Sequence, residues 1–112
     1  MHKIFTTPVA DVYVHYVNKI ERKSGTVADL HQVMCWLTGF SESQLKKHLA
    51  AKTTFEDFFA KAHLNERAEF ITGSICGVKI QEIEDPLMKK IRYLDKLVDE
   101  VANGRAMEKI LR

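Results

Sequence analysis

A histidine and two cysteines are the residues of this sequence that most directly suggest metal or thiol chemistry. His31 and Cys35 stand four residues apart, so on a helix they share one face, and this spacing can supply two zinc ligands. Further ligands would have to come from Cys76, His48 or His63, and the sequence contains neither C-x-x-C nor H-E-x-x-H. We therefore expect no metal site and no cofactor.

A cysteine nucleophile needs an activating base and a lowered thiol pKa. Cys35 and Cys76 both stand among apolar residues, so we expect buried, inert thiols and no catalytic residue. The sequence favours a non-catalytic protein, and an enzyme remains the alternative. A small-ligand or enzyme site built around Cys76, His31 and Tyr93 stays open as an alternative, and it requires a hollow that joins at least two of them.

Residues 41–51 resemble the recognition helix of a helix-turn-helix, because they follow a helix and a glycine. Lys46 and Lys47 are placed to contact phosphate, Gln44 to reach a base edge, and His48 completes the set. The segment has no arginine, and Glu42 would repel phosphate. The alternative interpretation is a packing corner with solvated lysines.

Four residues are candidates for an interaction surface: Trp36, Arg92, Tyr93 and Asp95. Arg92 and Asp95 are three residues apart on one predicted helical face, so we expect them to form an ion pair with each other.

The composition is that of a globular domain that needs no disulfide or metal to hold its core. The chain has 112 residues, of which 46% are apolar and 29% charged, and its net charge is +2. No apolar run approaches the roughly 18 residues of a membrane span, so we expect no membrane partner. Two cysteines without a leader segment are typical of reduced thiols in the cytoplasm. The length corresponds to a single helical domain over residues 1–112.

Helix-start and helix-stop residues divide the chain into segments. Predicted starts lie at Thr7-Pro8, at the capping boxes of residues 26–29 and 41–44, at Thr53-Thr54 and at Asp85-Pro86, and predicted stops lie at Gly25, Gly39 and Asn103-Gly104. A last short helix is expected within residues 105–112. Leucine, isoleucine and valine recur every three or four residues between positions 87 and 101, which predicts a central core helix or, alternatively, a homodimer face.

Residues 71–80 carry conflicting signals. Their β-branched residues favour a strand and Gly73 weakens a helix, but no second strand pattern is present to pair with. We predict a helix here, with Gly77 as a hinge between two helical segments. The resulting fold class is all-α, a small compact orthogonal bundle of five to seven helices.

Several longer segments resemble the bacterial domain-of-unknown-function family 2200 (DUF2200). They are Cys35-Trp36-Leu37-Thr38-Gly39-Phe40-Ser41, Ile71-Thr72-Gly73, Cys76-Gly77-Val78, Glu84-Asp85-Pro86-Leu87-Met88, residues 91–97 and residues 106–112. The likeness runs along essentially the whole chain. It implies a small, mostly helical bacterial protein, and it implies no activity, cofactor or catalytic residue.

The leading functional hypothesis is a small cytoplasmic, non-catalytic protein-interaction or self-association module, because each polar cluster has a structural explanation. Its partner is a second copy of the chain or another protein. A nucleic-acid-binding module using Gln44, Lys46, Lys47 and His48 is the second hypothesis, and the ligand or enzyme site described above is the third.

Overall fold

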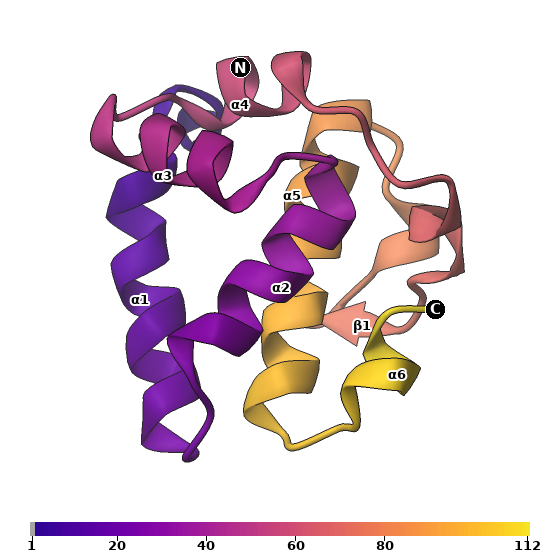
Figure 1. Cartoon of the computed structure of the whole chain (residues 1–112). Helices are drawn as coiled ribbons and strands as arrows, with labels where there is room; N and C mark the ends of the chain where they lie inside the picture. Colours follow the sequence, from indigo (N-terminus) through magenta and orange to yellow (C-terminus); the bar gives the residue numbers. More distant parts are fainter. Residues whose placement is uncertain (1) are drawn as a thin grey trace.

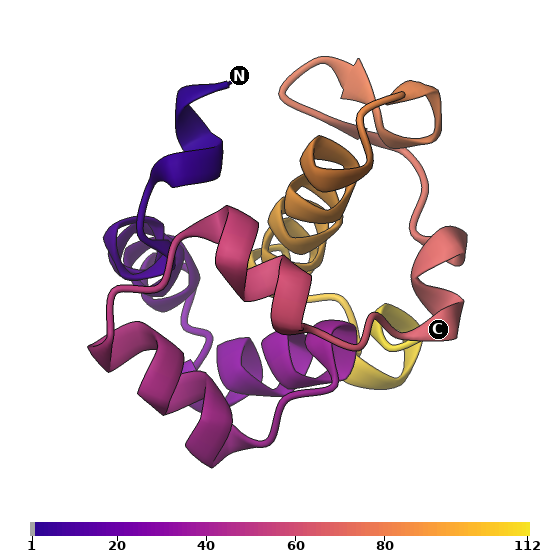
Figure 2. The same cartoon turned by 90° about the horizontal axis from the view of Figure 1, so that it is seen from above.

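Six α-helices dominate the computed structural model, which describes residues 2–112 (Figure 1). The α-helices are α1 (Val9–Arg22), α2 (Val27–Thr38), α3 (Glu42–Ala50), α4 (Phe55–Lys61), α5 (Pro86–Ala102) and α6 (Met107–Ile110). Three short 3-10 helices, η1 (Lys3–Thr6), η2 (Glu66–Phe70) and η3 (Ile80–Glu82), and two strands, β1 (Ser74–Ile75) and β2 (Val78–Lys79), complete the described chain. The helices cross steeply (Figure 2), so the predicted small helical bundle is confirmed.

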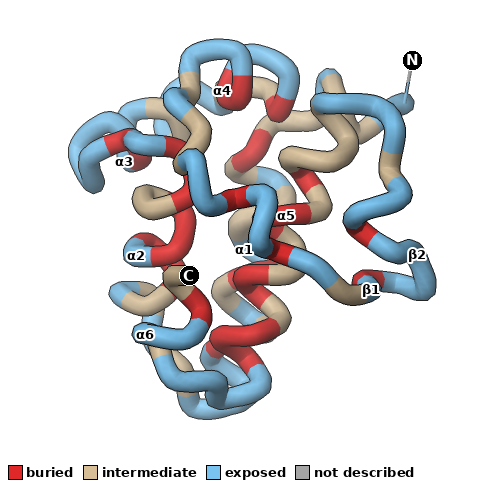
Figure 3. Tube along the Cα trace, turned by 90° about the vertical axis from the view of Figure 1, so that its right-hand side faces the viewer, coloured by how far each residue is buried: buried red, intermediate tan, exposed pale blue. Residues whose placement is uncertain are grey.

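The α5 helix is the centre of the bundle. It packs against α1, α2, α4, α6 and β1, and buried positions follow one another along most of its length (Figure 3). The predicted stripe is buried at Ile91, Leu94, Val98 and Val101. The stripe therefore belongs to the core of one chain, as the first of the two interpretations expects.

Side-chain caps account for where α2, α3 and α5 begin. Thr26 and Asp29 form a reciprocal capping box, and so do Ser41 and Gln44. The Asp85 carboxylate accepts a hydrogen bond from the Met88 backbone amide at 2.9 Å. These three predicted helix starts are confirmed.

Two predicted helix ends of α1 are wrong by one residue. The helix starts at Val9, because Pro8 has an extended backbone with ψ of 135° and pairs with Thr54 in an isolated bridge, and Thr7 caps η1 instead. At the other end Ser24, with φ of 69°, adopts the left-handed conformation predicted for Gly25. Gly25 is needed for space instead, since a Cβ there would lie 2.6 Å from the Ile20 methyl carbon.

The predicted helix over residues 71–80 is wrong. Ser74 pairs with Lys79 and Ile75 with Val78 in an antiparallel hairpin, so Gly77 is a turn residue and not a hinge between helices. Cys76 and Gly77 both have positive φ, 53° and 79°, which is the signature of the type I′ turn that joins twisted strands. The turn also exposes Cys76, so its predicted burial is wrong as well.

A buried carboxylate fixes the C-terminal residues to α5. Glu100 is 6% exposed, and its oxygens accept hydrogen bonds from the guanidinium of Arg112 at 2.7 and 2.8 Å and from that of Arg105 at 2.8 Å. The Arg112 side chain is 15% exposed and the Arg105 side chain 43%. Burial makes the Glu100–Arg112 pair the more important of the two, because an unpaired charge there would be costly.

We expect Cys76→Asn to stabilise the protein by about 0.5–1 kcal/mol, because asparagine tolerates the left-handed conformation that strains cysteine. Urea unfolding monitored by circular dichroism measures this change. Cys76→Val removes the same thiol but should destabilise, since β-branched side chains fit positive φ worst. Equal effects of the two substitutions would show that the turn does not have this geometry.

We expect Arg112→Ala to lower the free energy of unfolding by about 2–3 kcal/mol, because it leaves Glu100 buried with one guanidinium instead of two. The matched change Arg105→Ala should cost about 1 kcal/mol or less, since that arginine is more exposed. Thermal and urea denaturation of both variants decide the order. A larger loss for Arg105→Ala would contradict this interpretation of the buried pair.

Candidate functional site

Two tyrosines one turn apart on α1 each begin a chain of hydrogen bonds to other helices. The first chain joins α1, α2 and α3. The Tyr13 hydroxyl lies 2.6 Å from His31 Nε2, and His31 Nδ1 lies 2.9 Å from a Glu42 carboxylate oxygen. His31 is buried, because α3 begins directly beside it.

The order carboxylate, imidazole and hydroxyl resembles the arrangement that activates a nucleophile. Glu42 accepts from Nδ1, so Nε2 is free to accept the Tyr13 proton. However, burial and the charges of Glu21 and Glu42 raise the pKa of Tyr13, and burial followed by Glu42 raises that of the Cys35 thiol. Both groups are therefore held in their protonated forms, and this chain is suited to fixing α1, α2 and α3 relative to each other.

The second chain joins α1 to α5. The Tyr16 hydroxyl donates to Asp95 at 2.5 Å, and Arg92 Nη1 lies 3.1 Å from the other Asp95 oxygen. The predicted Arg92–Asp95 pair is confirmed. Burial, and after it the Asp95 charge, hold the pKa of Tyr16 well above its ordinary value, so the phenol stays a donor.

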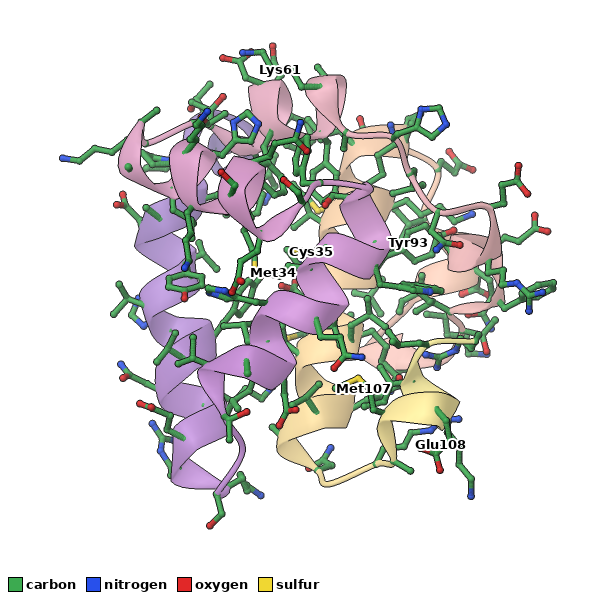
Figure 4. All side chains as sticks on the ribbon, in the orientation of Figure 1. Met34, Cys35, Lys61, Tyr93, Met107 and Glu108 are labelled. Atoms are coloured by element: carbon green, nitrogen blue, oxygen red, sulfur yellow. The ribbon has the colours of Figure 1, made fainter. Side chains whose placement is uncertain are left out.

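Cys76 and His31 line different hollows. Cys76 lies at one of about 250 Å³ with Tyr16, Lys19 and Asp95, whereas His31 lies at another of about 390 Å³ with Cys35 and Glu42. Tyr93 is only 7% exposed, and Figure 4 shows it within the molecule. The third hypothesis required one hollow to join two of Cys76, His31 and Tyr93, and the first two are not joined.

Among residues 2–112, no group of three or more histidine, cysteine, aspartate or glutamate side chains is arranged to hold a metal ion. His31 and Cys35 do share a hollow, as their spacing implies. Glu42 lines the same hollow, but its carboxylate is bonded to His31 Nδ1, and these three groups are not arranged to hold a metal ion.

The four candidate nucleic-acid residues divide into two pairs. Gln44 Oε1 accepts from the Ser41 amide, and His48 lies 3.1 Å from the Thr53 hydroxyl with its ring against Phe40. Burial lowers the pKa of His48, and the charge of Lys61 adds to the effect. Lys46 and Lys47 are exposed and line a shallow surface hollow with Glu42. Two of the four side chains thus stabilise the fold directly.

The four candidate interaction residues also have structural contacts. Trp36 is half-buried and its carbonyl accepts a hydrogen bond from Asn65, Tyr93 is buried, and Arg92 and Asp95 pair with each other. No local pattern in the sequence marks Tyr13, Tyr16 or Glu42 as members of hydrogen-bonded networks. Tyr16 and Asp95 are 79 positions apart, so no local spacing could have revealed their contact.

These observations define a class of protein: a small, mostly helical bundle with one short hairpin. Its polar side chains form hydrogen-bonded networks within the protein. The described helices include none that is both long and apolar enough to cross a membrane. Residues 3–112 match the model of a family described as an uncharacterized protein conserved in bacteria, DUF2200. The chain belongs to this family, as the resemblance noted in the sequence implied.

A solved structure carries the same fold. It is titled "Crystal structure of uncharacterized protein SP1917", and it is 43% identical in sequence with a TM-score of 0.92. The alignment covers 99% of this chain and 93% of that one. A comparison with curated proteins gives no match. The family and the fold are thus shown, and neither description specifies an activity.

We expect acid to destabilise the protein partly through His48. Its pKa is lowered by folding, so the unfolded chain binds a proton first, and stability falls as the pH drops from about 7 through the folded pKa. Comparing urea unfolding of the wild type and His48→Gln at about pH 7 and about pH 5 isolates this contribution. The variant should lose less stability on acidification. An equal loss in both proteins would refute the assignment.

Proposed function

We propose that this protein is a non-catalytic protein-interaction module whose contact surface lies on residues 64–85, called here the acidic segment. The supporting observation is Phe70, which is 57% exposed although two residues close to it in the chain are fixed in the core. Ala68 and Ile71 on either side are 2% and 1% exposed. The aromatic ring is therefore presented to solvent from an anchored backbone.

An anchored aromatic is well suited to binding, because little side-chain entropy is lost when a partner covers it. Val78, 43% exposed, adds a second apolar side chain from the hairpin of the same segment. The segment runs along one side of the bundle, outside the central helix (Figure 1). An apolar centre with a polar surround is typical of interaction surfaces.

Charge indicates the kind of partner. The acidic segment carries more carboxylates than cations: Glu66, Glu69, Glu82, Glu84 and Asp85 against Arg67 and Lys79. Glu66 and Glu69 belong to the same 3-10 helix as Phe70. Two copies of this surface facing each other would repel, so the fitting partner presents basic side chains around an apolar centre.

The polar groups support a non-catalytic role. Tyr13, Tyr16, His31 and Asp95 make hydrogen bonds inside the protein, and no buried side-chain nitrogen or oxygen of residues 2–112 lacks a partner. We place the module in the cytoplasm, where an exposed free thiol such as that of Cys76 stays reduced.

The test uses a synthetic amphipathic helix with leucine on one face and lysine on the other, titrated into the whole protein. Binding to the labelled peptide is followed by fluorescence anisotropy. Phe70→Ser should weaken binding about tenfold or more, because it removes the apolar centre. Val14→Ser is the matched control, since Val14 is 55% exposed but belongs to α1. Replacing the peptide's lysines by glutamates should abolish binding.

Three outcomes would overturn the proposal. Equal effects of the Phe70→Ser and Val14→Ser substitutions would show that the acidic segment is not the contact surface. Binding of the glutamate peptide would refute the charge argument. Sedimentation that shows a dimer of the wild type and a monomer of Phe70→Ser would identify a second copy as the occupant.

A further inference from the structure

We propose that a hollow between η1, α1 and the first half of α5 is a binding site for a small apolar carboxylate. The hollow has a volume of about 180 Å³. Most of its walls are hydrocarbon, from side chains that include Ile4, Val12, Phe55, Met88 and Ile91. Four helical elements, η1, α1, α4 and α5, therefore line a space that is apolar in most directions.

The polar lining of the hollow consists of His2, Tyr16, Arg92 and Asp95, and its one carboxylate is paired. Both oxygens of Asp95 are engaged, one by the Tyr16 hydroxyl and the other by Arg92. The guanidinium of Arg92 has five N–H donors, and the bond to Asp95 is made by one of its terminal nitrogens, Nη1. Nε and Nη2 of Arg92 are left for an acceptor that enters the hollow.

A second donor comes from the N-terminal residues. His2 lines the same hollow, and its Nδ1 accepts a hydrogen bond from the Ile4 amide at 3.1 Å. An imidazole whose Nδ1 accepts must carry its proton on Nε2, so His2 presents an N–H as well. A carboxylate is the acceptor that a guanidinium and a neighbouring N–H recognise best, because its two oxygens match two donors.

The size of the hollow limits the rest of the ligand. Its volume equals that of about six water molecules, which corresponds to a short hydrocarbon chain or a single ring. Hexanoate and benzoate are probes of this size. The hydrocarbon part would replace water along the apolar walls, and the carboxylate would lie at the end formed by Arg92 and His2.

The neighbouring hollow at Cys76 carries less of this chemistry. It shares Tyr16 and Asp95 with the first. Its cation, Lys19, has a single side-chain nitrogen, which pairs with Asp99 at 3.1 Å, whereas Arg92 pairs through Nη1 and keeps Nε and Nη2. We therefore assign anion binding to the hollow that Arg92 lines and not to the hollow at Cys76.

The experiment titrates hexanoate into the full chain labelled with 15N and follows amide shifts around Val12, Met88 and Arg92. We expect saturable binding with a dissociation constant of about 1 mM or lower. Hexylammonium and hexanol, which have the same chain length, should bind at least about tenfold more weakly. Arg92→Gln should weaken hexanoate binding about tenfold or more, whereas Arg67→Gln, outside the hollow, should leave it unchanged.

A second variant keeps the test decisive if Arg92→Gln unfolds the protein. Met88→Trp fills the hollow from a half-buried position and should abolish hexanoate binding while the melting temperature changes little. No saturable shifts with hexanoate would overturn the site. Equal or tighter binding of hexylammonium, or unchanged binding by Met88→Trp, would also overturn it. None of these outcomes bears on the peptide surface around Phe70.

Discussion

The burial of α5 on several sides at once is the constraint on which the remaining structure depends. A helix that contacts α1, α2, α4, α6 and a strand leaves few positions for solvent. Its polar residues must therefore find partners inside the protein, and they do so in Tyr16–Asp95–Arg92 and in Glu100 with its two arginines. Hydrophobic burial sets where α5 lies, and these bonds set how its neighbours are oriented.

This constraint also separates the regions that hold the fold from those that face outward. The tyrosine, histidine and carboxylate groups that could otherwise take part in chemistry are hydrogen-bonded to one another in the two networks that begin on α1. The acidic segment, by contrast, packs through isolated anchors such as Ile71 and Ile80 and presents the side chains between them. We therefore propose the acidic segment and the small hollow beside Arg92 as the features that act on other molecules.

Local signals in the sequence predict most of the helices, but they do not predict the hairpin. Ser41 with Gln44 and Asp85 with Pro86 determine helix starts through contacts within four residues, so they could be recognised in advance. The hairpin was missed because each strand has two residues and because cysteine replaces the asparagine that usually precedes glycine in such turns. The polar chains join residues distant in sequence, and only the packing of helices on α5 brings them together.

Hydrogen exchange of the backbone amides, measured by NMR on the native protein, tests the central role of α5 most directly. If the fold depends on this helix, the amides between Ile91 and Val101 exchange only through global unfolding and are the slowest in the protein. The amides of the acidic segment then exchange through smaller, local openings. The account would be contradicted if α5 exchanged by local opening while α1 and α2 stayed protected.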